Sequence, residues 1–399
     1  MRPLKNGYFV IEGLNSFAVT FYLYYFYFFT QRQFGFGDQT NLILAALNGG
    51  VYALAAWWGG RFAQRRGYFA GLKTGLLLMA GSVAAGTQCV SATAHVLVMC
   101  GVTVGSCFTW PALEALVSDG ESRAGLQRRV GLYNVVWAGT GALAYFLGGA
   151  LLDRGGVQSF FLVPLGIQII QFTLTLWLER LSRRLPPAGP ARQEAPAATA
   201  AAAIPPAPPE ARLFLRLAWF SNPFAYIAIN TLLAVMPGLA QRLELSTTLA
   251  GFYCSVWCFA RVAAFIGLWW WSGWHYRFRW LLLAFGLLVG AFAMILMAPN
   301  LAVLIGAQLG FGGAIGLIYY SSLFYSMDAG DAKGEHGGIH EAAIGLGNFG
   351  GPAVGALFLY ALPQYPQSGT LAVSGLLLGG LAGLVVIRQT ARKRPPPPA

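Results

Sequence analysis

Twelve long apolar runs, divided six and six by a proline- and alanine-rich tract at 185–210, constrain this chain more than any other feature. Each run has about 18–25 residues, enough at helical rise to cross a bilayer core of roughly 30 Å. The sequence therefore predicts an all-α integral membrane protein with twelve transmembrane helices in two pseudo-symmetric six-helix bundles. The expected spans are 8–30, 40–60, 70–90, 95–118, 130–152, 158–178, 213–238, 248–271, 280–297, 300–325, 340–361 and 370–388.

Composition supports solvation by lipid. Only 10% of the residues are charged and 56% are hydrophobic, whereas a soluble domain has about a quarter of its residues charged. The net charge of +12 comes from basic residues that gather on one side of the predicted spans. This positive-inside bias places both termini and the central tract in the cytoplasm, with the chain in a plasma or inner membrane. It also explains the basicity without nucleic-acid binding.

The apolar runs and the central tract divide the chain into four predicted segments. The tract has no apolar face to bury and is expected to act as a flexible cytoplasmic linker. The sequence at Asn15 (Asn-Ser-Phe-Ala) resembles that at Asn222 (Asn-Pro-Phe-Ala), which indicates an internal repeat. The segments are an N-terminal bundle at 1–180, the linker at 181–212, a C-terminal bundle at 213–388 and a cytoplasmic tail at 389–399.

Two motifs carry a resemblance to a known family. The loop after the second run keeps Gly60, Arg65 and Gly67 of the pattern G-x-x-x-D-(R/K)-x-G, with Gln64 in place of the aspartate. With the two six-helix halves, this loop makes the chain resemble the major facilitator superfamily over its whole length. The resemblance implies alternating access by two rocking halves, with the loop contributing to closure of the cytoplasmic side.

The eleventh run contains Gly351, Pro352 and Gly355, a version of the G-P-x-x-G pattern that the same family associates with antiporters. Small residues permit close helix crossing and proline permits a bend. Ordinary packing glycines of a membrane bundle explain the pattern equally well, so it does not by itself indicate antiport.

Among the charged residues of the predicted spans, Glu12, Glu114 and Arg261 are the ones that cannot readily escape the apolar run. A charge near the bilayer centre costs about 2.5–3.5 kcal/mol, so these side chains are expected to face a cavity or a partner. The family resemblance implies that the helices of Glu12 and Glu114 line the central cavity and that Arg261 lies on an interface helix. Arg261 is a candidate for binding an anionic group of a solute; a structural pair with Glu341 is the alternative.

Polar residues on other predicted spans complete the candidate site. Asn222, Tyr226 and Asn230 recur at intervals of four and form one stripe on a helix face. They suit a polar organic solute, with interhelical hydrogen bonding as the alternative. The remaining candidates for solute binding or coupling are Asn15, Tyr319, His340 and Glu341.

His340 and Glu341 begin the eleventh run and form a candidate gating or proton-coupling cluster. Histidine titrates near neutral pH. A helix N-terminus capped by acidic residues is the alternative explanation of this segment. The order of its residues does not match a zinc-peptidase motif, and we expect no bound metal.

These patterns predict a secondary transporter that moves a small polar or anionic organic solute by alternating access. Protons are the candidate coupling ions, in symport. The sequence contains no catalytic constellation and no phosphate-binding loop of the Walker type, so we expect neither an enzyme nor a cofactor. We expect a monomer in the lipid bilayer. A passive facilitator and an integral membrane transferase are the alternatives.

Overall fold

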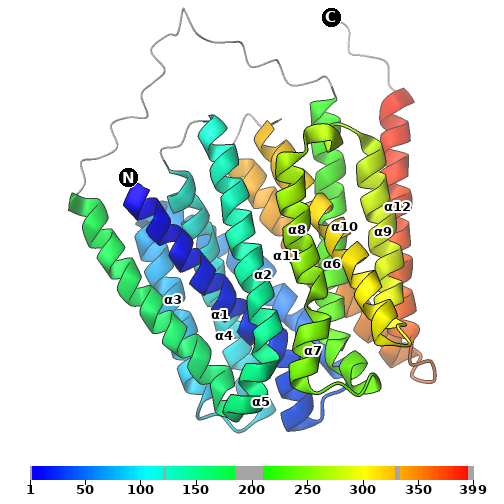
Figure 1. Ribbon diagram of the computed structural model, residues 1–399, viewed down its shortest axis with the longest axis horizontal. Helices are drawn as coiled ribbons and strands as arrows, with labels where there is room; N and C mark the ends of the chain where they lie inside the picture. Colours follow the sequence, from blue (N-terminus) through cyan, green and yellow to red (C-terminus); the bar gives the residue numbers. More distant parts are fainter. Residues whose placement is uncertain (1, 120–122, 185–209, 329–332, 394–399) are drawn as a thin grey trace, which may run out of the picture.

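The computed structural model describes residues 2–119, 123–184, 210–328 and 333–393, and every regular element among them is helical (Figure 1). The elements before the central tract are α1 (Arg2–Phe34), α2 (Asp38–Arg66), α3 (Tyr68–Gly86), α4 (Ala92–Ser118) and α5 (Arg123–Arg184). Those after it are α6 (Ala211–Arg242), α7 (Thr247–Cys254), α8 (Val256–Trp270), the 3-10 turn η1 (Ser272–Trp274), α9 (Phe278–Leu296), α10 (Leu301–Asp328), α11 (Lys333–Ala361) and α12 (Ser368–Lys393).

Ten segments of the described residues are long and apolar enough to cross a membrane. One of them, Arg128–Arg184, has 57 residues and contains both runs expected at 130–152 and 158–178. No loop separates the two arms of α5; the helix changes direction at Gly156, whose φ of 66° lies in the region that favours glycine. The Ser159 hydroxyl donates to the carbonyls of Gly156 (2.7 Å) and Leu151 (3.0 Å), which stabilises the bend.

Two further boundaries differ from the sequence prediction. The run expected at 248–271 is divided at Ser255 into α7 and α8. The flanking helices reach Arg184 and start at Ala211, so they take in both ends of the segment predicted as a linker. The middle of that segment, 185–209, lies outside the described residues.

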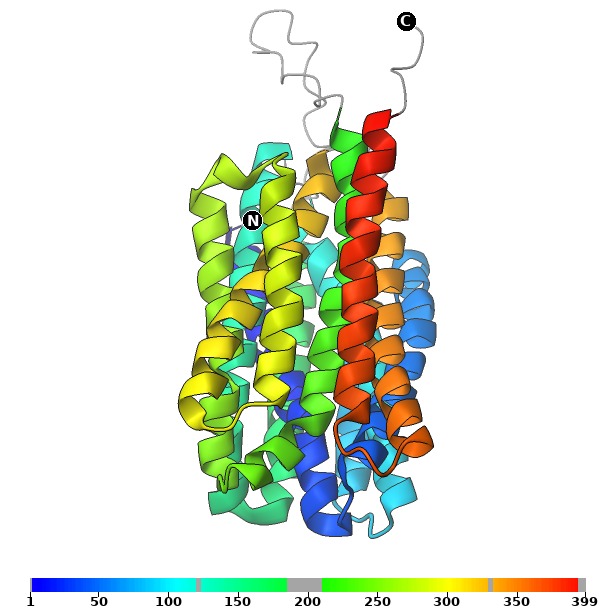
Figure 2. The same ribbon diagram turned by 90° about the vertical axis from the view of Figure 1, so that its right-hand side faces the viewer.

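The helix pairings recur on both sides of the central tract. α1 packs on α5 as α6 packs on α11, α2 packs on α4 as α8 packs on α10, and α3 packs on α4 as α9 packs on α10. The two groups meet where α2 contacts α11 and where α5 contacts α7 and α8. Figures 1 and 2 show the start of α1 and the end of α12 at the same end of the bundle, which we call the termini face.

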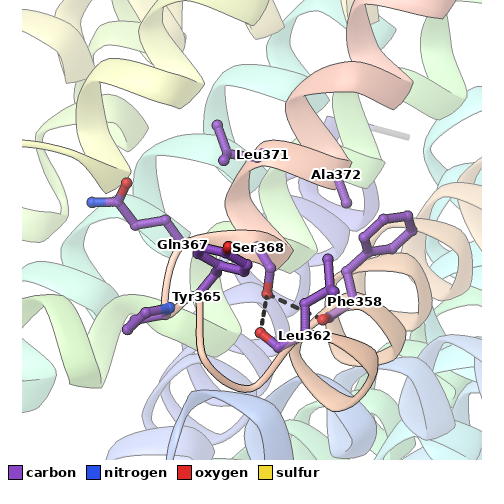
Figure 3. Close-up of a pocket in the computed structure, with 8 residues that line it drawn as sticks. Phe358, Leu362, Tyr365, Gln367, Ser368, Leu371 and Ala372 are labelled. Carbon is purple, nitrogen blue, oxygen red and sulfur yellow. Dashed lines mark hydrogen bonds between the residues drawn. The ribbon is translucent and has the colours of Figure 1, made fainter.

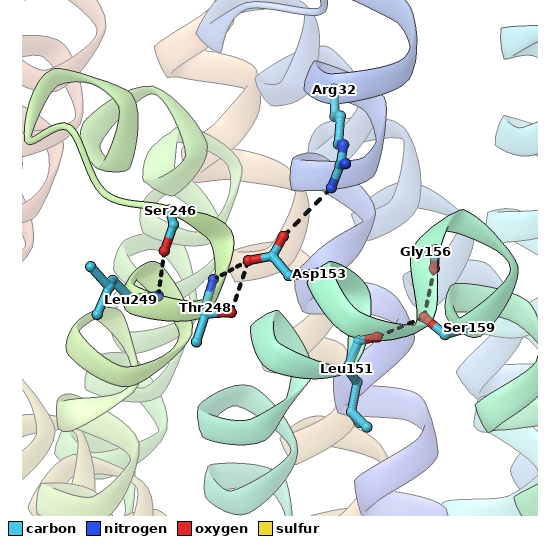
Figure 4. Close-up of polar contacts among 8 residues, drawn as sticks. All are labelled: Arg32, Leu151, Asp153, Gly156, Ser159, Ser246, Thr248 and Leu249. Atoms are coloured by element: carbon cyan, nitrogen blue, oxygen red, sulfur yellow. Dashed lines mark hydrogen bonds and ion pairs between the residues drawn. The ribbon is translucent and has the colours of Figure 1, made fainter.

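The face at the other end, the opposite face, holds a polar link between the two groups (Figure 4). Asp153, beside the bend of α5, accepts hydrogen bonds from the Thr248 backbone N–H (2.9 Å) and hydroxyl (2.8 Å) at the start of α7. Arg32 of α1 lies 3.5 Å from the other carboxylate oxygen. A carboxylate at a helix N-terminus is also favoured by the helix dipole. We call Arg32, Asp153 and Thr248 the Asp153 clasp.

Candidate functional site

Arg261 lies in α8 with only 5% of its surface exposed, held between aromatic rings from both helix groups. Its guanidinium carbon is 4.6 Å from the ring centroid of Trp137 on α5 and 5.1 Å from that of Trp257, one turn earlier on α8. The hydroxyl of Tyr24 on α1 is a further electrostatic neighbour. Cation–π contact stabilises a desolvated guanidinium, so these rings replace part of the lost hydration.

The hydrogen-bonding capacity of Arg261 is not exhausted. Its Nε is buried and has no hydrogen-bond partner among the described residues. No described carboxylate lies within ion-pair distance of it, and the side chain of Glu341, its candidate structural partner, lies outside the described part of the chain. A buried cation with a spare donor and aromatic walls is suited to binding an anionic group.

Tyr319 of α10, like Arg261 in the second helix group, contacts Trp137 of the first group. Its ring stacks on Trp137 with centroids 5.6 Å apart and planes 23° apart, and it contacts Phe265 at 5.6 Å and Tyr226 at 6.5 Å. Side chains from α5, α6, α8 and α10 therefore converge around one point. We call Trp137, Trp257, Arg261 and Tyr319 the aromatic cage.

A buried carboxyl on α1 is linked to this cluster through Tyr133. Glu12 of α1 is 0% exposed, and neither of its carboxyl oxygens has a hydrogen bond of good geometry within the described residues. Its electrostatic neighbours are Tyr133 on α5 and Glu114 on α4, and Tyr133 is in turn a neighbour of Tyr319. Glu114, in contrast, is an exposed residue of α4. The structure thus brings Glu12 and Glu114 together, next to the aromatic cage.

The amide candidates have individual contacts. Asn15 is fully buried and its Nδ2 donates to the Thr109 hydroxyl on α4 at 3.2 Å. Asn230 donates to Asn348 of α11 at 2.5 Å, whereas Tyr226 faces Tyr319 of α10. Asn222 is fully buried in α6. Asn15 and Asn230 therefore make interhelical hydrogen bonds, and Tyr226 is the member of the stripe that reaches the cage.

The motif residues lie away from this cluster. Gly67 joins α2 to α3 with φ of 95°, and its N–H donates to the Ala63 carbonyl at 2.9 Å. Gln64 and Arg65 are exposed on the last turn of α2, the helix that also carries Gly60. A side chain at Gly351 would lie 2.5 Å from the carbonyl of Ile227, so the glycine allows α11 to touch α6.

Pro352 and Gly355 are buried on the same helix as Gly351. His340 also belongs to α11, but its side chain, like that of Glu341, lies outside the described part. The cavity at the turn between α11 and α12, lined by Phe358, Tyr365 and Leu371 among others, is mostly apolar and far along the chain from the cage residues (Figure 3).

Sequence reasoning named Tyr226 and Tyr319 but missed the two tryptophans of the site, Trp137 and Trp257. Trp257 and Arg261 are four residues apart, as are Tyr133 and Trp137, the spacing that places side chains on one helix face. That spacing was an available signal for the walls of the cage. The approach of Trp137 to Arg261 could not be read from the sequence, because it depends on how α5 packs against α8.

Comparison with known proteins places this architecture in a family. The sequence profile of the Major Facilitator Superfamily matches residues 8–352, so the chain belongs to this superfamily of membrane transporters. A comparison of the sequence with curated proteins found no match.

Solved structures share the fold. A bacterial homologue of the human lysosomal transporter Spinster, in an inward-facing and occupied conformation, has a TM-score of 0.71 at 14% identity, covering 100% of this chain and 99% of that one. The human organic anion transporter MFSD10 (TETRAN) has a TM-score of 0.66 at 18% identity, covering 96% of this chain and 99% of that one. A structure described under substrate recognition in proton dependent oligopeptide transporters has a TM-score of 0.64 at 15% identity, covering 96% of this chain and 98% of that one. At these identities the likeness establishes the fold and leaves the solute open.

Proposed function

We propose that this protein is a secondary transporter that carries a small organic anion across the membrane by alternating access. The observation that carries the proposal is the buried Arg261, which has a spare donor and is walled by Trp137 of one helix group and Trp257 of the other. An anion bound there touches both groups at once, so the free energy of binding depends on how the groups are arranged. One structural relative is named an organic anion transporter, which supports this class of solute.

Glu12 is the proposed proton carrier. Burying an ionised carboxylate costs far more free energy than burying a neutral carboxyl, and Glu12 is 0% exposed. Rehydration in another conformation would allow it to ionise, with Tyr133 and Glu114 as electrostatic neighbours. Uptake and release of one proton per cycle at this position would make the protein a proton symporter. A relative described as proton dependent supports this coupling.

The proposed topology has twelve crossings. At about 1.5 Å per residue the segment Arg128–Arg184 measures about 85 Å, more than twice a bilayer core. Dividing it at Gly156 adds one crossing to the ten apolar segments, and α1 adds another. The bundles at 1–180 and 213–388 then form the moving halves. The linker at 181–212, the tail at 389–399 and both termini face the cytoplasm of a cell membrane.

The test is uptake into proteoliposomes that contain the full-length protein. Wild-type vesicles are incubated in a panel of labelled organic anions, amino acids and sugars, with and without an inward proton gradient, and the label that enters them is measured. We expect saturable anion uptake that the gradient accelerates. Uptake that ignores the gradient would identify a passive facilitator, and the absence of anion uptake would contradict the proposal.

Glu12→Gln separates coupling from solute binding, because glutamine keeps the shape and removes the titrating group. We expect that a proton gradient no longer accelerates anion uptake by the variant. Exchange of external labelled anion for anion preloaded inside the vesicles should be retained. The matched control is Glu244→Gln, an exposed residue between α6 and α7 at the opposite face. If a proton gradient accelerates anion uptake by Glu12→Gln as much as by the wild type, Glu12 is not the proton carrier.

A further inference from the structure

A second cavity lies at the termini face, in the seam between α5 and the end of α8. It measures about 360 Å³ and is walled by the first two turns of the α5 crossing, by the end of α8 with η1, and by the last part of α10. Its lining residues are Arg128, Val130, Gly131, Asn134, Leu268, Trp269, Ser272, His275, Tyr320, Leu323 and Phe324. In Figure 1, α5 and α8 stand side by side, and the turn from α8 to α9 is at the end where the chain termini lie. We call this space the seam cavity.

Every polar residue of the seam cavity can donate a hydrogen bond, and none of the described residues that line it is an acid. Arg128 is exposed and supplies a full positive charge. At Gly131 the missing side chain leaves room for the indole Nε1 of Trp269 and the hydroxyl of Tyr320, each 3.8 Å from where a Cβ would be. This set of groups favours an anionic ligand over a cationic or neutral one.

The side-chain amide of Asn134 is a hydrogen-bond donor of the seam cavity that makes no hydrogen bond to the described residues. The residue is only 1% exposed, lines the cavity, and its Nδ2 has no hydrogen-bond partner among the described residues. A buried amide N–H left without a partner costs about 1–3 kcal/mol, so such groups call for an explanation. A ligand that accepts this hydrogen bond supplies one.

The remaining walls are apolar, and the surroundings indicate the depth of the seam cavity in the bilayer. Val130, Leu268, Leu323 and Phe324 provide aliphatic and aromatic surface. Beside them Trp270 is 80% exposed, and Trp269 and Trp271 are also exposed at the end of α8. Exposed tryptophans concentrate at the interface between lipid and water. A ligand at this level can reach the cavity from the leaflet.

From these observations we propose that the seam cavity binds an amphiphilic organic anion, with a carboxylate or phosphate head at Arg128 and Asn134 and an apolar body against Leu268 and Phe324. The inference rests on the proposed function, because it assigns the transported solute to the amphiphilic class. Asn134 lies six positions after Arg128, about 9 Å along the helix. Trp137 of the aromatic cage follows one turn later, and Tyr320 adjoins Tyr319. Two residues of the aromatic cage therefore lie close, along α5 and α10, to residues that line the seam cavity.

The test measures binding in lipid nanodiscs, without a gradient, so that its outcome is independent of transport. A dodecanoate analogue with a diazirine on its chain is photo-crosslinked to the full-length protein, and the labelled peptides are mapped by mass spectrometry. We expect labels on the α5 and α8 segments that line the cavity, displaced by dodecanoate and by dodecyl phosphate. Butyrate, inorganic phosphate and dodecyltrimethylammonium are expected to displace the probe at least tenfold more weakly. Labels confined to other surfaces, or equal displacement by the cationic amphiphile, would overturn the proposal.

Variants locate the head group. Arg128→Gln is expected to weaken probe binding about tenfold, the loss typical of one charge-assisted hydrogen bond. The control is Arg277→Gln, an exposed arginine close to His275 that does not line the cavity. Equal probe affinity in Arg128→Gln and the control would contradict the assignment.

Asn134→Leu distinguishes a ligand-binding amide from a structural one. Removing an unpartnered donor should raise the melting temperature of the ligand-free protein and lower the affinity for the probe about tenfold. A lower melting temperature with unchanged affinity would show that Asn134 is structural and would overturn its part in the site. If both variants lose binding while wild-type vesicles transport no anion, the cavity remains a ligand site and only the transport proposal fails.

Discussion

Replacement of Arg261 by methionine is expected to raise stability and abolish transport. Arginine near the centre of a bilayer costs about 2.5–3.5 kcal/mol. The two cation–π contacts at 4.6 and 5.1 Å offset about 1 kcal/mol each. Methionine is flexible, apolar and polarisable, so it fills the space between the rings without a desolvation cost. The net gain in the free energy of unfolding is about 1 kcal/mol.

A gain of that size corresponds to an increase of about 2 °C in melting temperature for a chain of this length. The assay compares thermal unfolding, followed by intrinsic fluorescence in nanodiscs, with initial rates of anion uptake. The control is Arg279→Met, because Arg279 is exposed and its guanidinium lies 5.5 Å from the Trp280 ring. This control should change neither stability nor uptake appreciably.

The reasoning would be refuted by a large loss of stability in Arg261→Met. Such a loss would show that the guanidinium satisfies a structural partner, and that its free Nε is incidental. Retained anion uptake in a stable Arg261→Met protein would refute the binding role directly. Arg261→Lys provides a further distinction, because lysine keeps the charge but loses the planar fork that binds an anion bidentately. We expect it to bind solute more weakly without a change in topology.

Two other perturbations follow from the packing. Asp153→Ala removes both hydrogen bonds to Thr248 and should favour opening of the opposite face by about 2 kcal/mol. The distance between spin labels at Gln33 and Glu244 should then show a longer population. An unchanged distance distribution would rule the Asp153 clasp out as a determinant of closure. Gly351→Val places a side chain against the Ile227 carbonyl and should lower stability by about 1–3 kcal/mol. Gly350→Val, next to it on α11 and free of neighbours within 4 Å, is the control for the melting temperature.

The linear pattern of the sequence was sufficient for the class of fold. Apolar runs of bilayer length are readable one by one, because lipid solvation requires each spanning helix to be apolar along its own length. The same pattern identified the rare buried charges Glu12 and Arg261, since a charge inside an apolar run has few explanations. It also predicted that glycines of the eleventh run allow close helix approach, as Gly351 does against α6.

Tertiary structure decided which of those residues meet. Asn230 and Tyr226 share one predicted stripe, yet the first bonds Asn348 of α11 and the second faces Tyr319 of α10. Trp137 and Arg261 are separated by more than a hundred residues and become neighbours only through the contact of α5 with α8. A helix period tells which side chains share a face, but the rotation of each helix and its neighbours are set by packing of the whole bundle. The cage, the Asp153 clasp and the seam cavity all arise at that level.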